Sequence, residues 1–421
     1  MRLIRTAGRG KVEAEALIAQ LSDRRNASFD RVLPMARRIV EGVRKGGDAA
    51  LLRYRSKLDG ISSQQPLRIA EEEMRAALDA IPVKLRAALK TAAKNIRTFA
   101  EKQKPRDWDF RPARGVVTGQ RVRPLDAVGC YVPSGRYPLP STLLMTAIPA
   151  QVAGVQRIAV ISPRPAKETL AAAALLGITE FYRIGGAQGI AALAYGTESI
   201  PCVDKIAGPG NAYVTAAKKL IAFDCGIDML AGPTEIVVTS DAGDPAGIAA
   251  DIVAQAEHDP DALAVLLTSN AALAKAVVAD VKQRVRTNKV AKESIAANGI
   301  VIVTNTSEEA RTITNRIAPE HLTVDSEEDL AWVRNAGSVF IGRYSAQPLG
   351  DYVSGPNHTL PTNGLARLRG GLSVLDFVKV ITVQQYSMEG VEELGPAGIA
   401  LAEAEGLQGH AEAIRVRGVN V

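Results

Sequence analysis

Residues 127–138, Ala-Val-Gly-Cys-Tyr-Val-Pro-Ser-Gly-Arg-Tyr-Pro, are the stretch that decides the fold. They begin as a short apolar run, typical of a buried strand, and end in a loop that contains glycine and proline. We expect a helix over Ser141–Ala153, a strand over 157–162, a helix over 166–176 and a strand near 181–184. This alternation predicts an α/β fold with a parallel, doubly wound sheet that binds ligands at the carboxyl ends of its strands.

The sequence on the amino-terminal side of this stretch has a different texture. Apolar residues recur at helical spacing over 29–58, with a break at Gly46-Gly47, and again over 71–102. One apolar face and one solvated face explain both stretches, so they are predicted helices without candidate chemistry. Residues 1–25 are polar and mixed, and are expected to form an arm or a short helix.

Length and composition limit the class of protein. A chain of 421 residues is long enough for two or three domains, each with its own core. Its longest apolar runs, such as 190–194, are too short to cross a bilayer, and no apolar segment typical of a secretory signal follows the first arginines. Three cysteines without metal-type spacing (Cys130, Cys202 and Cys225) are typical of a reducing cytoplasm, where we expect the protein.

The net charge of +6 does not indicate a nucleic-acid partner. Basic and acidic residues are interspersed, and no basic run is interleaved with aromatic residues. A mildly basic surface that attracts small anionic ligands is the better interpretation.

Two glycine-containing turns are candidate ligand contacts. The chain has no G-x-G-x-x-G fingerprint, so a standard dinucleotide grip is not supported. Residues 205–213, Lys-Ile-Ala-Gly-Pro-Gly-Asn-Ala-Tyr, lead into a helix whose first amides can hold a phosphate, although an ordinary helix start uses the same glycines. Thr234 follows Gly232-Pro233 at the edge of a strand over 236–239, which suits a substrate contact and an ordinary turn equally well.

An adjacent carboxylate and imidazole, Glu320 and His321, follow Pro319 and make the candidate catalytic pair. Two proton acceptors side by side suit acid–base chemistry at one reacting centre, because histidine titrates near neutral pH and burial raises the pKa of a glutamate toward it. Such dipeptides also occur on solvated surfaces. The chain has four histidines, however, and each lies in a segment with candidate chemistry.

The other three histidines indicate a metal site. A helix from Asp244 to about His258 places Gln255 and His258 on one face. A polar, glycine-rich loop over 350–358 contains Asp351 and His358, and residues 405–410 end a short helix at His410. Imidazole, carboxylate and amide oxygen without cysteine suit Zn²⁺ or Mn²⁺, but the segments are too far apart in sequence for spacing alone to establish a site.

Together these segments resemble the histidinol dehydrogenases, in order and over nearly the whole chain. The matching stretches are Tyr131–Pro133 (YVP), Ile184–Gln188 (IGGAQ), Ala207–Tyr213 (AGPGNAY), Asp228–Pro233 (DMLAGP), Gln255–His258 (QAEH), Ala318–Leu322 (APEHL), Gly350–Thr362 (GDYVSGPNHTLPT) and Glu405–His410 (EGLQGH).

The resemblance implies a cytoplasmic enzyme that oxidises L-histidinol to L-histidine through L-histidinal, with one Zn²⁺ per subunit and two NAD⁺ reduced in succession. It implies that Glu320 activates the water that hydrates the aldehyde and that His321, as a neutral imidazole, accepts the alcohol proton. The implied zinc ligands are Gln255, His258, Asp351 and His410. The implied substrate contacts are these four residues with Thr234, His321, His358 and Glu405, and the implied NAD contacts are Tyr131, Gln188 and Asn211.

The family fold implied for this chain is two similar incomplete Rossmann-like domains with parallel sheets, plus small terminal extensions that intertwine in a homodimer. The implied division is an arm over 1–25, a discontinuous zinc and catalytic domain over 26–127 and 236–372, an NAD-side domain over 128–235, and a dimerisation segment over 373–421. Glu405 and His410 would then complete the partner's active site.

Two departures from the family pattern affect these expectations. Many members have Gly-Gly after Tyr-Val-Pro, whereas this chain has Ser134-Gly135 followed by Arg136 and Tyr137. The family pattern therefore does not predict the shape of this NAD-side loop. Thr234 stands where many members have serine, which keeps the hydroxyl.

Three rival functions stay open at this point. A related zinc- and NAD-dependent dehydrogenase of another small polar alcohol would keep the metal and base residues, but His358 and the 405–410 segment favour histidinol. A zinc hydrolase would use Glu320 on a metal-bound water and would need neither the Gln188 turn nor the Asn211 turn. A non-catalytic metal-binding protein would not need the Glu320-His321 pair.

Overall fold

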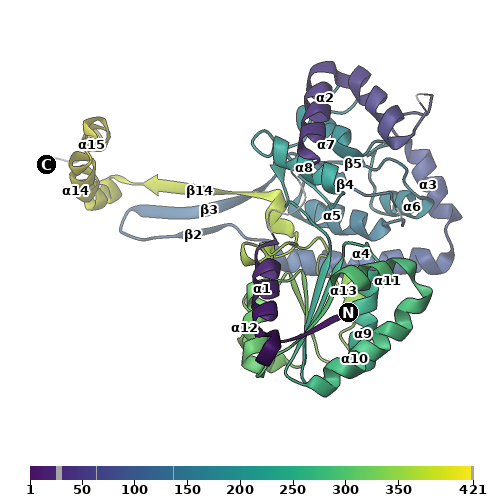
Figure 1. Ribbon diagram of the computed structural model, residues 1–421. Helices are drawn as coiled ribbons and strands as arrows, with labels where there is room; N and C mark the ends of the chain where they lie inside the picture. Colours follow the sequence, from purple (N-terminus) through teal and green to yellow (C-terminus); the bar gives the residue numbers. More distant parts are fainter. Residues whose placement is uncertain (25–30, 63, 136, 419–421) are drawn as a thin grey trace.

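The computed structural model describes residues 1–24, 31–62, 64–135 and 137–418, so Arg136 of the predicted NAD-side loop lies outside it. Two parallel sheets, each covered by helices, lie one above the other, and a long arm extends from them (Figure 1). The predicted α/β fold with two Rossmann-like sheets is therefore confirmed.

The first sheet has five parallel strands in the order β6-β5-β4-β7-β8. Its strands read as short apolar runs because helices cover both faces, as is usual for parallel sheets. The strands are β4 (Ala127–Tyr131), β5 (Arg157–Ile161), β6 (Glu180–Tyr182), β7 (Lys205–Ala207) and β8 (Gly226–Ile227), and the helices between them are α5 (Pro140–Ala153), α6 (Lys167–Leu175), α7 (Gly186–Tyr195) and α8 (Ala212–Ile221).

Three more helices cover this sheet: α2 (Leu33–Tyr54), α3 (Glu71–Ala80) and α4 (Val83–Gln103). The predicted helix over 71–102 is thus two helices, separated at Ile81-Pro82, while the predicted break near Gly47 is a residue with φ of 49° inside α2. The apolar face of α2 packs on α7 and α8, α3 packs on α6, and α4 packs on α5. This packing groups the three helices with 128–235, not with 236–372 as the predicted boundaries have it.

The second sheet has six parallel strands in the order β1-β11-β10-β9-β12-β13. Its edge strand β1 (Arg2–Arg5) pairs with β11, so the first residues belong to this sheet and are not an arm. The other strands are β9 (Glu235–Thr239), β10 (Leu263–Thr268), β11 (Gly299–Val303), β12 (His321–Val324) and β13 (Ser338–Ile341), with helices α1 (Lys11–Ser22), α9 (Pro245–Ala256), α10 (Ala271–Arg284), α11 (Lys289–Asn298), α12 (Ser307–Ile317) and α13 (Gln347–Tyr352).

The arm is a long antiparallel ribbon that ends in two helices far from both sheets (Figure 1). It consists of β2 (Trp108–Phe110), β3 (Val116–Pro124), β14 (Val378–Tyr386), α14 (Met388–Ala404) and α15 (Gln408–Arg415). Large apolar side chains such as Ile381 and Leu401 are exposed on it. Within the described ranges, no helix is long and apolar enough to cross a membrane.

Candidate active site

The predicted catalytic residues lie in a cleft between the two sheets. Pro209 and Met229, at the carboxyl ends of β7 and β8, line one side of it. Thr234, Glu320 and His321, at the amino ends of β9 and β12, line the other. Ligands of doubly wound sheets bind at the carboxyl ends of strands, so the five-stranded sheet faces the cleft with its usual binding edge.

Glu320 is buried and oriented by β9. Its Oε2 accepts a hydrogen bond of 2.6 Å from Thr234 Oγ1 and one of 2.7 Å from the backbone N–H of Glu235. The turn that delivers it contains Ala318, whose φ of 52° is left-handed. Helix α12 therefore ends abruptly, and the chain reverses into β12 within three residues.

His321 is also buried, and β9 and α13 both contact its ring. Its Nδ1 is 3.1 Å from the Glu235 carbonyl oxygen and 3.6 Å from Glu320 Oε2, and its Nε2 is 3.4 Å from Asp351 Oδ1. Burial lowers the pKa of His321, but the two carboxylates outweigh it and raise the pKa to about 10. A cation bound at Asp351 would offset that carboxylate's charge and lower the pKa of His321, so the neutral imidazole expected near pH 7 stays a prediction.

Asp351 lies in α13, not in a loop as predicted for 350–358. Gln347, one turn earlier, donates a 2.6 Å hydrogen bond from Nε2 to Asp351 Oδ2. His358 Nδ1 is 2.7 Å from the Asp351 carbonyl oxygen, and burial lowers the pKa of His358. Gln347 was not singled out from the sequence, because only the helical turn places it beside Asp351.

Gln255 is fully buried at the end of α9, with its two amide atoms in different situations. Its Nε2 donates to Thr234 Oγ1, whereas its Oε1 has no hydrogen-bond partner among the described residues. His258 follows the helix on the exposed side of the same cleft, with Nδ1 3.0 Å from the Ala254 carbonyl oxygen. Three of the four implied metal ligands, Gln255, His258 and Asp351, therefore line one cleft.

Glu405 and His410 are not brought to this cleft within one chain. Glu405 follows α14 and His410 lies in the first turn of α15, so these residues do not end a single short helix as predicted. Both are exposed on the arm. Accordingly, the described part of the chain has no group of three or more His, Cys, Asp or Glu residues placed to hold a metal.

The three predicted NAD contacts all follow strands of the five-stranded sheet. Tyr131 ends β4, and burial raises its pKa to about 12. Gln188 lies in α7, which begins at the predicted Gly185–Gln188 turn; its Nε2 donates to Asp59 Oδ2 at 3.1 Å, and its Oε1 has no partner in the described ranges. Asn211 caps α8 by accepting hydrogen bonds from two backbone N–H groups.

A buried ion pair fixes the glycine turn beside Asn211. Lys218 Nζ is 2.6 Å from both the Gly208 carbonyl oxygen and Asp228 Oδ1, and Asp228 Oδ2 accepts a 2.7 Å bond from the Gly208 N–H. Both side chains are almost completely buried. Lys218 thus stabilises the glycine turn and is not available to a phosphate. Its position in the sequence did not indicate this structural role.

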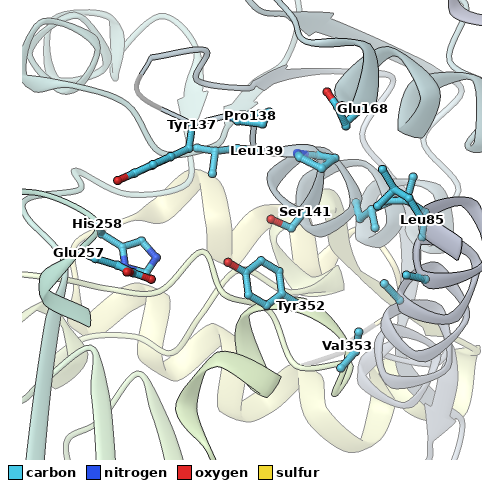
Figure 2. A pocket seen from close by; sticks show the side chains of 15 residues that line it. Leu85, Tyr137, Pro138, Leu139, Ser141, Glu168, Glu257, His258, Tyr352 and Val353 are labelled. Atoms are coloured by element: carbon cyan, nitrogen blue, oxygen red, sulfur yellow. The ribbon is translucent and has the colours of Figure 1, made fainter. Parts of the chain in front are cut away.

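A wider apolar groove adjoins the cleft, with Leu85 and Val353 on one side and Tyr137 and Leu139 on the other (Figure 2). His258, like Leu139, lines both hollows, so the cleft opens directly into this groove.

Known proteins resemble this chain in sequence along nearly its whole length. A family model described as histidinol dehydrogenase matches residues 22–418. The chain belongs to the histidinol dehydrogenase family. It is 44% identical over 431 residues to the histidinol dehydrogenase of Gluconobacter oxydans, covering 99% of each chain. It is 47% identical to that of Geobacillus kaustophilus over 392 residues, covering 90% of this chain and 92% of the relative.

The structure of a family member agrees with the sequence comparison. The crystal structure of histidinol dehydrogenase from Elizabethkingia anophelis aligns with a TM-score of 0.92 at 34% identity, covering 99% of this chain and 98% of that one. The protein is thus an oxidoreductase of the histidinol dehydrogenase family, with its fold preserved along nearly the whole chain.

Proposed function

We propose that this protein oxidises L-histidinol to L-histidine through L-histidinal, with two hydrides passing in succession to two NAD⁺ and with a bound Zn²⁺. One observation carries the proposal. Glu320 and His321 both contact the backbone of Glu235, the first residue of β9, in a cleft where Gln255 Oε1 has no hydrogen-bond partner among the described residues. Family membership supplies the substrate class.

Zn²⁺ fits the donors of this cleft. The buried Oε1 of Gln255 has no hydrogen-bond partner in the described structure, which is costly unless a ligand satisfies it. Asp351 and His258 supply a carboxylate and an imidazole on the same cleft. When bound there with a further imidazole from His410, Zn²⁺ would anchor nitrogen atoms of histidinol.

The chain's own residues account for the proton transfers. His321 takes the hydroxyl proton while hydride leaves the alcohol carbon, and Glu320 deprotonates the water that hydrates the aldehyde. Thr234 and the Glu235 amide orient the Glu320 carboxylate through Oε2. His358 lines the cleft as a substrate contact, and Tyr131, Gln188 and Asn211 hold NAD at the edge of the five-stranded sheet.

The arm supports a homodimer with shared active sites. It carries Glu405 and His410 away from their own cleft and exposes apolar side chains along the ribbon and α14 (Figure 1). In the dimer, these two residues would complete the cleft of the partner subunit. We place the enzyme in the cytoplasm, since NAD and reduced cysteines belong there.

The test is NADH formation on adding L-histidinol and NAD⁺ to zinc-loaded protein, with histidine counted as product. We expect two NADH per histidine. Glu320→Gln removes the water-activating base and should lower histidine formation by about a thousandfold, because base catalysis contributes roughly 10²–10⁴. Absence of NADH, despite bound zinc, would favour a dehydrogenase of another alcohol or a zinc hydrolase.

Substitutions at two buried glutamines can test the proposed zinc site and the proposed NAD site independently. Among the described residues, the Oε1 of Gln255 and that of Gln188 have no hydrogen-bond partner, whereas both Nε2 atoms do, so each residue is a matched control for the other. We expect Gln255→Leu to lower zinc affinity at least tenfold and to leave NAD binding unchanged, and Gln188→Leu to do the reverse. Zinc content by elemental analysis and NADH titration give both numbers, and loss of zinc from both variants would contradict the assignment.

A further inference from the structure

Glu235 contacts both proposed catalytic residues through its backbone. Its N–H donates to Glu320 Oε2 at 2.7 Å, and its carbonyl oxygen is 3.1 Å from His321 Nδ1. Because both contacts belong to one residue, its position fixes the carboxylate and the imidazole relative to each other. A shift of this residue would misplace the two groups together.

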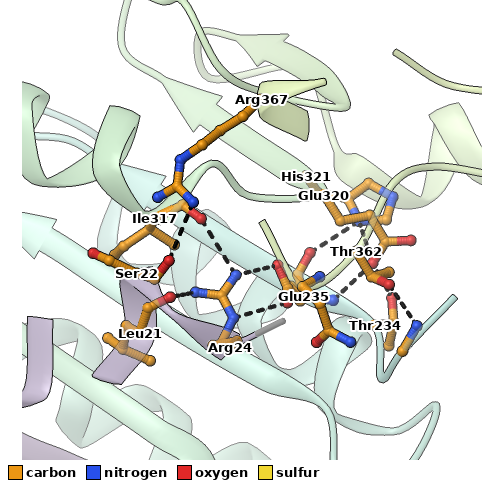
Figure 3. Close-up of polar contacts among 12 residues, drawn as sticks. Leu21, Ser22, Arg24, Thr234, Glu235, Ile317, Glu320, His321, Thr362 and Arg367 are labelled. Atoms are coloured by element: carbon orange, nitrogen blue, oxygen red, sulfur yellow. Dashed lines mark hydrogen bonds and ion pairs between the residues drawn. The ribbon is translucent and has the colours of Figure 1, made fainter. Parts of the chain in front are cut away.

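The side chain of Glu235 points away from the cleft into an ion pair (Figure 3). Arg24, just after α1, forms a fork with it: Nε is 3.1 Å from Oε1 and Nη2 is 2.7 Å from Oε2. Asn363 N–H donates to Oε1 at 2.9 Å. Burial raises the pKa of Glu235, and the Arg24 guanidinium partly offsets this rise.

The same guanidinium also reaches the segment that delivers Glu320. Arg24 Nη2 donates to the Ile317 carbonyl oxygen at 3.4 Å, and Arg24 Nη1 bonds the Leu21 carbonyl oxygen. Ile317 ends α12 three residues before Glu320. Arg24, which follows the amino-terminal helix, therefore contacts both the residue that touches the catalytic pair, Glu235, and the helix end that leads into it, Ile317, as Figure 3 shows.

We propose that Arg24 and Glu235 are positioning residues for the oxidation, which hold Glu320 and His321 in register from behind the cleft. Neither lines the cleft; both line a separate hollow on the far side of β9. We therefore expect an effect on the reaction to arise from the placement of the catalytic pair and not from contact with the substrate. This inference rests on the proposed function for its kinetic readout only.

The kinetic test compares Arg24→Gln with Arg157→Gln, which breaks a partly buried ion pair with Glu180 in the five-stranded sheet. Well below the melting temperature, we expect Arg24→Gln to lower kcat about a hundredfold with little change in KM for histidinol, since a misplacement near 1 Å costs that much. Arg157→Gln should leave kcat within about twofold, and Arg24→Lys should recover part of the loss, because it keeps the charge and loses the fork. Unchanged kcat in folded Arg24→Gln would overturn the inference.

A second readout does not depend on activity. The chain has four histidines, so ¹⁵N-histidine labelling gives few imidazole signals, and His321→Asn assigns that of His321. Arg24→Gln should shift the His321 Nδ1 signal and Arg157→Gln should not; an unmoved signal overturns the inference. If Arg24→Gln does not fold, Arg24→Lys decides by the same measurements. Wild-type protein without NADH formation would refute the proposed function, while the imidazole signal would still decide this inference.

Discussion

The carboxyl edges of the two parallel sheets differ in what their polar groups do. At the five-stranded sheet, Gln188 Oε1 has no partner among described residues, and Asn211 is exposed at the start of α8. At the six-stranded sheet, Asp241 follows β9 and Asp325 follows β12, and both carboxylates are fully engaged with their neighbours. We call the first edge open, because Gln188 Oε1 lacks a partner among the described residues, and the second edge closed, because both of its carboxylates are hydrogen-bonded.

The closed edge uses its own carboxylates where a nucleotide-binding sheet would hold phosphate. Asp241 accepts hydrogen bonds from Thr268 Oγ1, Ser269 N–H and Ser307 Oγ at 3.0, 2.5 and 2.5 Å. Asp325 accepts bonds from Ser240 Oγ and from two backbone N–H groups. The donors are satisfied, and the negative charge would repel a pyrophosphate.

Because of this difference, the two sheets contribute different parts of the proposed site. In the proposed function, NAD would bind at the open carboxyl edge of the five-stranded sheet, while the six-stranded sheet contributes Thr234, Glu320 and His321 from its amino edge. Sheet topology alone would allow either edge to bind the cofactor. The side chains that follow the strands decide between them.

Among the tests of this comparison, we expect the largest effect from adding one methyl group to the glycine turn at the open edge. Gly208 has a φ of 118°, and a Cβ there would collide with the Tyr131 carbonyl oxygen. Gly208→Ala should displace the turn before α8 and weaken NAD binding at least tenfold, with a stability loss of about 2 kcal/mol. Calorimetric NAD titration and thermal unfolding measure the two effects.

Gly177→Ala is the matched control for this substitution. Gly177 also has a positive φ, 67°, but a Cβ there meets nothing within 4 Å. It should cost about 1 kcal/mol through backbone strain and leave NAD affinity unchanged. Equal NAD affinities for the two variants would mean that the glycine turn is not part of the open edge.

The closed edge should respond in stability and not in cofactor binding. Asp241→Asn keeps the shape and removes the charge, so we expect a loss of about 2 kcal/mol, typical of hydrogen bonds to a charged group, with unchanged KM for NAD. Burial raises the pKa of Asp241, but its hydrogen bonds outweigh this and lower it. The stability it contributes is present above about pH 4 and lost as pH falls through the lowered pKa.

Urea unfolding of wild type and Asp241→Asn at pH 7 and pH 3 tests this prediction. The difference between the two proteins should shrink at pH 3. A weaker NAD affinity in the variant would show that the six-stranded sheet also contacts the cofactor, and the comparison of the two edges would fail.

The sequence predicted β4, β5 and β6 of the five-stranded sheet, because strands buried on both faces read as unbroken apolar runs such as 127–132, but it missed the short strands β7 and β8. It could not predict where α2 to α4 pack, since an amphipathic pattern shows which face is buried and not what covers it. It also missed β1, because Arg2-Leu3-Ile4-Arg5 is short and charged at both ends.

The sequence singled out some of the site residues and missed others for a related reason. Local motifs and family resemblance named Glu320, His321 and Gln255. The supporting residues escaped because their partners are distant in sequence: Arg24 and Glu235 are 211 residues apart. Lys218 and Asp228, which form a buried ion pair, are ten residues apart and were not recognised as partners. Long-range pairs of this kind follow from the tertiary fold and leave no periodic signal.

We expect the smallest effect at Asp251, a carboxylate with fewer hydrogen bonds than those of the closed edge. Burial raises the pKa of Asp251, on α9, to about 6, and a single hydrogen bond from the Gln347 N–H opposes the rise. Because this folded-state pKa exceeds the unfolded value, ionisation costs stability as pH rises from about 4 to above 6. Asp251→Asn should therefore gain about 1 kcal/mol at pH 7.5, after allowance for solvent screening, and nothing at pH 4. Urea unfolding at both pH values measures this. The sign is opposite to that of Asp241→Asn at neutral pH. A loss of stability in both variants would mean that the number of hydrogen bonds to each carboxylate does not distinguish Asp251 from Asp241.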